Sequence, residues 1–304
     1  MKSYLSTIVA GFLGISMFLA CGEQKKPDMS EVEAALDSAE QTMPEISSEN
    51  IEAILSSIPS PLELSSHIQE AGIHYDKSLL NDPDNYSRYT SSFQKALNLG
   101  IYGTDLGYTN LYEQTQDGLN YLAVIQKLSD DLNIGQFFDF ESLKRLTDNK
   151  SNLDSLLMIT NQNFNRINNH FIEQNNASLS ALLLTGGWLE ALHLANQVTL
   201  SRMQNQDLRE RLGEQKIVLD NILILLEVYG KNDKQIAGLL DDFRRLEVAF
   251  RPVTISYHYE ESTSRVVDGV LEIESTSTSE VSITDEDIRK IAEITEEIRN
   301  KVIS

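Results

Sequence analysis

Apolar residues recur at spacings of three and four along most of this 304-residue chain. One clear series lies in the second half of the chain: Ile236, Leu239, Leu240, Phe243, Leu246 and Phe250. Because a helix has 3.6 residues per turn, this spacing places the apolar side chains on one face. The pattern predicts a mainly α fold, an irregular multi-helix bundle whose helices bury their apolar faces against one another.

The same spacing gives the order of the helices. A short helical segment should carry Tyr86, Tyr89, Phe93 and Leu97 and end at the Leu99-Gly100 pair, and one long helix should run on from Tyr108 to Leu132. Residues 177–200 and 218–228 are apolar almost all round, which is typical of helices at the centre of a bundle.

After Pro252 the apolar residues alternate, with Val253, Ile255 and Tyr257 on one face of a strand. Asp268-Gly269 then lies between two β-prone runs, which predicts an antiparallel hairpin. We therefore expect a small β element at about 253–283, in which the Ser/Thr run of residues 275–279 is either a loop or a strand edge. Thr284 and Asp287 have capping-box spacing and predict the start of a C-terminal helix.

The N-terminus has the pattern of an export signal. Lys2 precedes an apolar stretch from Ile8 to Ala20, which is too short to span a membrane comfortably. It ends in Phe18-Leu19-Ala20-Cys21-Gly22, which resembles the lipobox of bacterial lipoproteins. The resemblance implies that residues 1–20 are a cleaved signal peptide, that Cys21 carries lipid, that residues 21–29 are a tether, and that residues 30–304 form the body. The alternative is an ordinary secretory signal with an incidental Cys.

Charge and cysteine content limit the partners of the body. Cys21 is the only Cys, so no intramolecular disulfide can form. The formal net charge of −21 at pH 7 repels nucleic acid and anionic lipid headgroups. Attachment to a membrane should then come from fatty-acyl chains such as palmitate on Cys21. Gly22, rather than Asp, after the Cys resembles lipoproteins that proceed to an outer membrane of the cell envelope.

Polar and aromatic side chains gather in two places. The first includes Tyr102, Asp105, Tyr108 and Tyr112, interspersed with glycines that allow close helix approach. Asp105 could cap the long helix, and the tyrosines could line a groove; alternatively they are core residues. This segment resembles uncharacterised all-helical envelope lipoproteins of Bacteroidota-type bacteria, a resemblance that implies no activity.

The second place is the presumed central helix, which holds Trp188, Glu190 and His193. Glu190 and His193 have the Glu-x-x-His spacing of di-metal bundles, but such sites need two of these units, and no other His follows a Glu at that distance. We therefore expect no metal. The pair could line a pocket or connect two helices as an internal polar contact.

The sequence contains no nucleophile elbow, P-loop or dinucleotide fingerprint, and we expect no cofactor. The first hypothesis is a non-enzymatic envelope lipoprotein that binds another envelope protein or supports an assembly. The alternative is a small-ligand-binding lipoprotein, and an enzyme of unrecognised type is third. In the alternative, both helices pack around one polar cavity that is lined by Tyr102, Asp105, Tyr108, Tyr112, Trp188, Glu190 and His193.

Overall fold

The computed structural model describes residues 53–54, 58, 73–148, 162–163, 166–258, 263–267, 270–274 and 278–304. The chain divides into the units Met1–Glu45 and Ile46–Ser304, and all described residues belong to the second. The predicted signal peptide, Cys21 and the tether lie outside them. Within the described part, no helix has both the length and the apolar character needed to cross a membrane.

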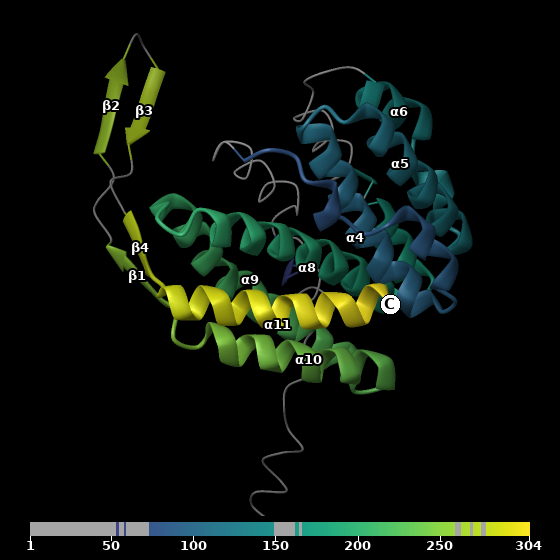
Figure 1. Cartoon of the computed structure of the whole chain (residues 1–304). Coiled ribbons are helices and arrows are strands. Elements are labelled where there is room, and N and C mark those ends of the chain that lie inside the picture. The colour runs from purple at the N-terminus through teal and green to yellow at the C-terminus, as the bar shows by residue number, and fades with distance from the viewer. Residues whose placement is uncertain are drawn as a thin grey trace, which may run out of the picture. The chain divides into compact units, whose positions relative to one another are not determined.

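The mainly α fold is confirmed (Figure 1). The helices are α4 (Ser92–Leu111), α5 (Thr115–Asp131), α6 (Phe140–Asp148), α8 (Ala177–Ser201), α9 (Gln206–Gly230), α10 (Lys234–Phe250) and α11 (Asp285–Ile303). Short 3-10 helices span Lys77–Leu79, Pro83–Arg88 and Gly135–Phe137. Helix α8 packs against α4, α9 and α11 and is buried over most of its length, as its apolar composition predicts.

Glycines let α4 and α8 approach closely. A Cβ atom on Gly100 would overlap the carbonyl oxygen of Leu183, and one on Gly186 would overlap the carbonyl oxygen of Leu97. The Thr104 hydroxyl donates across the same contact to the Gly187 carbonyl, at 3.0 Å. Gly100 and Gly186, which carry no Cβ atom, therefore let these two backbones come into contact.

Two predicted helix boundaries are wrong, and the predicted segment with Tyr86 and Phe93 is not one helix, because Tyr86 lies in the 3-10 helix Pro83–Arg88 and Phe93 in α4. Gly100 does not end a helix, because α4 begins at the Ser91–Gln94 capping box and continues through Gly100 to Leu111. The helix expected from Tyr108 to Leu132 is broken between α4 and α5, where Glu113 has a φ of 56° in the left-handed region. Asp105 consequently caps no helix; it lies inside α4 and is fully buried.

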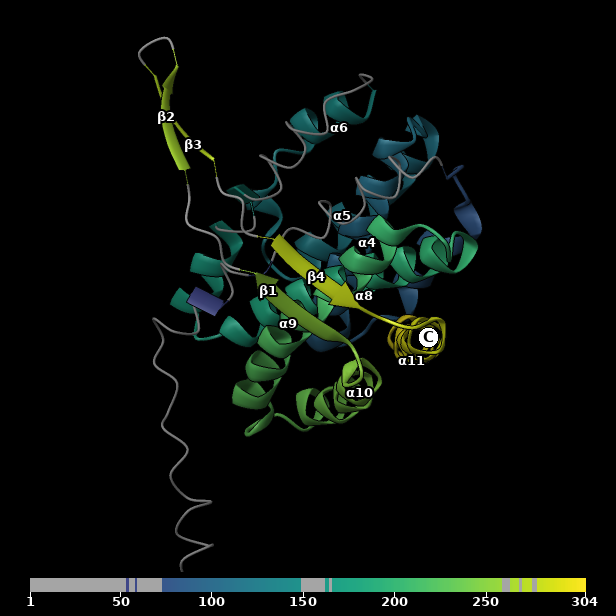
Figure 2. The same cartoon turned by 90° about the vertical axis from the view of Figure 1, so that its left-hand side faces the viewer.

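The β element consists of two antiparallel ladders. Strands β2 (Thr263–Val267) and β3 (Val270–Glu274) pair with Val267 opposite Val270, which confirms the predicted hairpin, although Asp268-Gly269 itself lies outside the described residues. Strands β1 (Thr254–His258) and β4 (Thr278–Ser282) pair beside α9, so residues 278–279 belong to a strand. Figure 2 shows this pair over α9.

Helix α11 follows β4 and begins at the predicted Thr284–Asp287 capping box. It then runs alongside α10, and its C-terminal end lies near α4 (Figure 1). The fold thus brings the last residues of the chain to the contact between α4 and α8.

Candidate functional site

The candidate residues on α4 and α8 are mostly buried. Tyr112 is half-buried, and the exposed fractions of the others are 0% for Tyr102, Asp105, Tyr108 and Glu190, 2% for Trp188 and 5% for His193. The structure brings some of them together and separates others. They fall into an acid cluster and a tyrosine cluster, while Tyr102 and Trp188 have other neighbours.

The acid cluster joins α4, α8 and α11. Arg299 of α11 donates from Nε to Glu190 Oε2 and from Nη2 to Glu190 Oε1, both at 2.6 Å. Its Nη2 also donates to the Leu79 carbonyl at 2.9 Å. This two-point geometry is that of an ionised carboxylate with a guanidinium, and both side chains are buried. Removing either partner would leave a buried charge without compensation.

Asp105 adds a second acid to this ion pair. Its Oδ2 accepts from the Asn81 backbone N–H at 3.1 Å, while its Oδ1 has no N–H or O–H donor among the described residues. Burial raises the pKa of Asp105 well above its ordinary value, the Glu190 carboxylate raises it further, and Arg299 only partly opposes these effects. With one guanidinium for two buried carboxyl groups, the neutral acid is the favoured form of Asp105, and a hydrogen bond with the Glu190 side chain contributes to this preference.

His193 lies beside this cluster, one helical turn from Glu190. Burial lowers the pKa of His193, and the opposing effect of Glu190 does not outweigh it, so the neutral imidazole is favoured. Its Nε2 has no hydrogen-bond partner in the described part of the chain. The interhelical contact that the structure describes is thus that of Glu190 with Arg299, and His193 lies next to it on α8.

Further hydrogen bonds tie the end of α11 to the body. Asn98 Nδ2 donates to the Val302 carbonyl at 3.1 Å, and the Tyr89 hydroxyl donates to the Ile303 carbonyl at 3.4 Å. Asn81 Nδ2 donates to the Tyr89 hydroxyl at 3.0 Å. These bonds satisfy carbonyl groups at the helix C-terminus, where no intrahelical donor is available.

The tyrosine cluster consists of Tyr75, Tyr108 and Tyr112, whose ring centroids lie 4.8–5.9 Å apart. The Tyr108 hydroxyl accepts from the Asp76 backbone N–H at 3.3 Å, and the Tyr75 hydroxyl donates to Asp117 at 2.9 Å. Such tilted rings are a favourable packing arrangement. These tyrosines therefore hold the segment before α4 against α4 and α5.

Tyr102 and Trp188 have other neighbours. The Tyr102 hydroxyl donates to the Asp82 carbonyl at 2.8 Å. Trp188 Nε1 donates to Gln215 at 3.0 Å, and its ring packs against Phe243 of α10 at 6.1 Å. Trp188 and Glu190 are two positions apart on α8, and such residues project about 200° apart around the helix axis. Trp188 therefore faces α9 and α10, and the structure does not bring it together with Glu190.

The acid cluster can hold and move a proton, but it presents no reactive group at the surface, since Asp105 and Glu190 have no exposed area. In the described residues, no group of three His, Cys, Asp or Glu side chains could hold a metal ion. Binding of a ligand by the predicted residue set remains a prediction.

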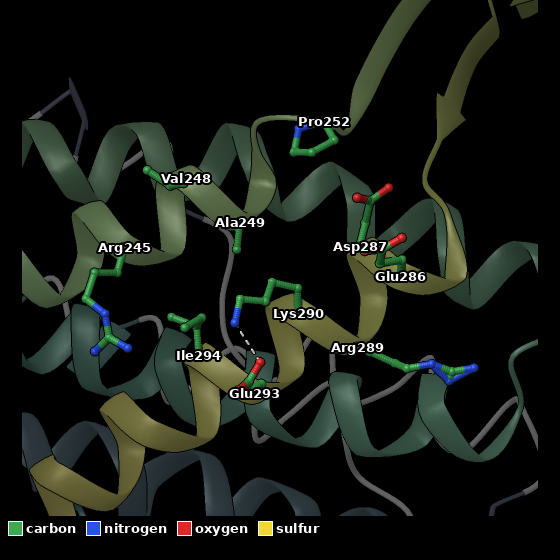
Figure 3. A pocket seen from close by; sticks show the side chains of 10 residues that line it. All are labelled: Arg245, Val248, Ala249, Pro252, Glu286, Asp287, Arg289, Lys290, Glu293 and Ile294. Atoms are coloured by element: carbon green, nitrogen blue, oxygen red, sulfur yellow. Dashed lines mark hydrogen bonds and ion pairs between the residues drawn. The ribbon is translucent and has the colours of Figure 1, made fainter.

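A surface groove of about 750 Å³ lies between α10 and α11 (Figure 3). Its apolar lining consists of Val248, Ala249, Pro252 and Ile294, and its charged lining of Arg245, Glu286, Asp287, Arg289, Lys290 and Glu293. Val248 is 54% exposed, and Lys290 pairs with Glu293 at 2.7 Å. Figure 3 shows Glu286 and Asp287 at the opposite end of the groove from Arg245.

Sequence reasoning missed three features of these sites: Tyr75, Arg299 and the groove. Arg299 follows Ala292 by seven residues, and both lie on the buried face of α11. A spacing of seven residues is about two helical turns, so the position of Arg299 on the same face as Ala292 was the available signal for a buried cation. Comparison of the chain with protein-family models, curated proteins and solved structures gives no match.

Proposed function

We propose that the protein is a non-enzymatic lipoprotein of the cell envelope, anchored through lipid on Cys21, whose helical body binds another envelope protein. The lipobox-like sequence Phe18-Leu19-Ala20-Cys21 supports the anchor and an outer-membrane location. The groove between α10 and α11 supports partner binding, and it is the observation that carries this proposal.

The occupant that fits this groove is an amphipathic helix of the partner. The apolar lining around the exposed Val248 suits the apolar stripe of a helix. Glu286 at one end favours a basic side chain there, in keeping with the net charge of −21 of the whole chain, whereas Asp287 accepts hydrogen bonds from Thr284.

Photo-cross-linking in the native envelope tests this proposal. A photoreactive amino acid replaces Val248 in one variant and Ile217 of α9 in a control, since Ile217 is 45% exposed and does not line the groove. We expect one discrete adduct at position 248, with a basic amphipathic helix as the cross-linked peptide, and a lower yield of it when Glu286→Lys is added. Equal adducts at both positions, or none at 248, would contradict the proposal.

A further inference from the structure

The C-terminal end of α11 is held by a buried ion pair, and the N-terminal half of α11, from Glu286 to Ile294, lines the groove. Arg299 reaches Glu190 of α8 and the Leu79 carbonyl, and its side chain is only 7% exposed. The neighbouring carbonyl groups of Val302 and Ile303 are hydrogen-bonded by side chains from α4 and the segment before it. The charge balance around Arg299 thus contributes to holding this end of α11, together with the ion pairs that Glu297 and Lys301 form with α10.

That balance changes with a single proton. With Asp105 neutral, Glu190 and Arg299 compensate each other, and the Asp105 proton completes a hydrogen bond to Glu190. When Asp105 loses this proton to solvent, two buried carboxylates share one guanidinium and the bridging hydrogen bond is gone. The extra charge is buried and uncompensated, and like-charge repulsion in a buried site is strongly unfavourable.

We propose that Asp105, Glu190 and Arg299 form a proton-dependent latch, which holds the C-terminal end of α11 on α8 while Asp105 is protonated and loosens it when Asp105 ionises. Opening of this end exposes Asp105 to water, where its carboxylate is well solvated. The open state therefore holds the proton more weakly than the closed state, and rising pH favours opening.

The other titratable groups around the cluster do not compensate the charge that Asp105 acquires when it ionises. Burial raises the pKa of each facing tyrosine, which keeps it neutral: Tyr75, Tyr89, Tyr102 and Tyr121. Burial lowers the pKa of His193 on α8. Glu296 of α11 acts on His193, and Arg299 stays charged. None of these groups supplies a second positive charge when Asp105 ionises.

The latch gives the groove a pH dependence, a consequence that rests on the proposed function. Helix α11 forms one wall of the groove, through Glu286 to Ile294, and α10 forms the other. Loosening the far end of α11 allows this wall to shift relative to α10. We expect the groove to keep the described arrangement of α10 and α11 at low pH. As pH rises, we expect the position of α11 relative to α10 to change. The latch itself can be tested without any partner, so failure of partner binding does not affect that test.

Hydrogen exchange of the mature protein, followed by mass spectrometry between pH 6 and 9, measures the latch directly. After correction for the intrinsic exchange rate, the opening constant of residues 294–303 should rise up to about ten-fold per pH unit in the wild type, because one proton is released on opening. Asp105→Asn should abolish this rise, since the amide keeps a donor for Glu190 and cannot ionise. Glu190→Gln should also abolish it, because Asp105 then faces Arg299 alone.

Two controls make the result specific. Glu293→Gln removes one exposed carboxylate from the same helix without touching the cluster, and it should retain the wild-type pH dependence. Helix α9, which contacts neither Asp105 nor Arg299 through any described hydrogen bond, should show a constant opening constant in every variant. A pH-independent α11 in the wild type would overturn the latch, as would a rise of equal size in α9 and α11.

Discussion

Replacing Asp105 by Asn should stabilise the folded protein at neutral pH, although the side chain is completely buried. Asparagine has nearly the same shape as the neutral acid. Its carbonyl can accept from the Asn81 N–H, and its NH₂ group can donate to Glu190 in place of the acid proton. The substitution therefore keeps the hydrogen bonds of the protonated form and removes only the ability to ionise.

The size of the effect follows from proton linkage. The unfolded Asp105 ionises near pH 4, whereas the folded one keeps its proton because its pKa is raised by burial and by Glu190. The free energy of unfolding of the wild type then loses about 1.4 kcal/mol for every pH unit in which only the folded state is protonated. The stabilisation that the raised pKa of Asp105 contributes is fully present below about pH 4. It is lost as pH rises toward the pKa of Asp105 in the folded state. The advantage of Asp105→Asn at pH 7 should therefore reach at most about 4 kcal/mol, the limit set by about three pH units in which only the folded state is protonated.

Urea unfolding followed by circular dichroism at pH 4, 5, 6, 7 and 8 provides the assay. The difference between variant and wild type cancels the titration of His193 and of surface groups that both proteins share. Asp117→Asn is a matched control for which the change in stability should have the opposite sign. Partial burial acts to raise the pKa of Asp117, but hydrogen bonds from Lys77 and Tyr75 outweigh this effect and lower the pKa. That variant should be less stable than wild type above about pH 4 and converge with it in acid. A gap for Asp105→Asn that does not grow with pH would refute a neutral Asp105.

Three further changes have distinct outcomes. Gly100→Ala should lower the melting temperature, because its Cβ would overlap the Leu183 carbonyl, whereas Gly103→Ala, with open space around it, should be neutral or stabilising by up to about 1 kcal/mol in thermal unfolding. Arg299→Met should cost about 3–5 kcal/mol in urea unfolding at pH 7, because Glu190 is left as a buried unpaired charge; a loss below 1 kcal/mol would contradict the buried ion pair. Cys21→Ser should abolish labelling by a clickable fatty acid and release the protein from membranes, and persistent labelling would disprove lipidation at that residue.

The sequence predicts the helices better than it predicts their ends. The three-four spacing over residues 236–250 corresponds to α10, and the apolar run over 177–200 corresponds to the buried α8. The break between α4 and α5 was missed because the residue in the left-handed region is Glu113, where glycine or asparagine is the usual signal. Gly100 was misread as a helix end because its role, contact with the α8 backbone, depends on a residue 83 positions away, Leu183.

The candidate site illustrates the same limit. Sequence patterns singled out Asp105, Glu190 and His193 as ionisable residues on apolar helices, and the structure places Asp105 and Glu190 in one cluster. The patterns could not show that Arg299 compensates them, because the cation comes from a helix 109 residues further along the chain than Glu190. They also grouped Trp188 with Glu190, whereas the helical rotation between these neighbours sends Trp188 toward Gln215.

The protonation state of Asp105 in the folded protein can be measured directly by carbon-13 NMR of the aspartate carboxyl carbons. The Asp105 signal is assigned by its absence in Asp105→Asn, and its position is followed from pH 4 to pH 9. A neutral Asp105 predicts that this signal keeps the position of a carboxylic acid at pH values well above about 4, the ordinary value for a solvated aspartate. An Asp105 signal that already has the carboxylate position at pH 5 would contradict both the proton-dependent latch and the predicted stabilisation.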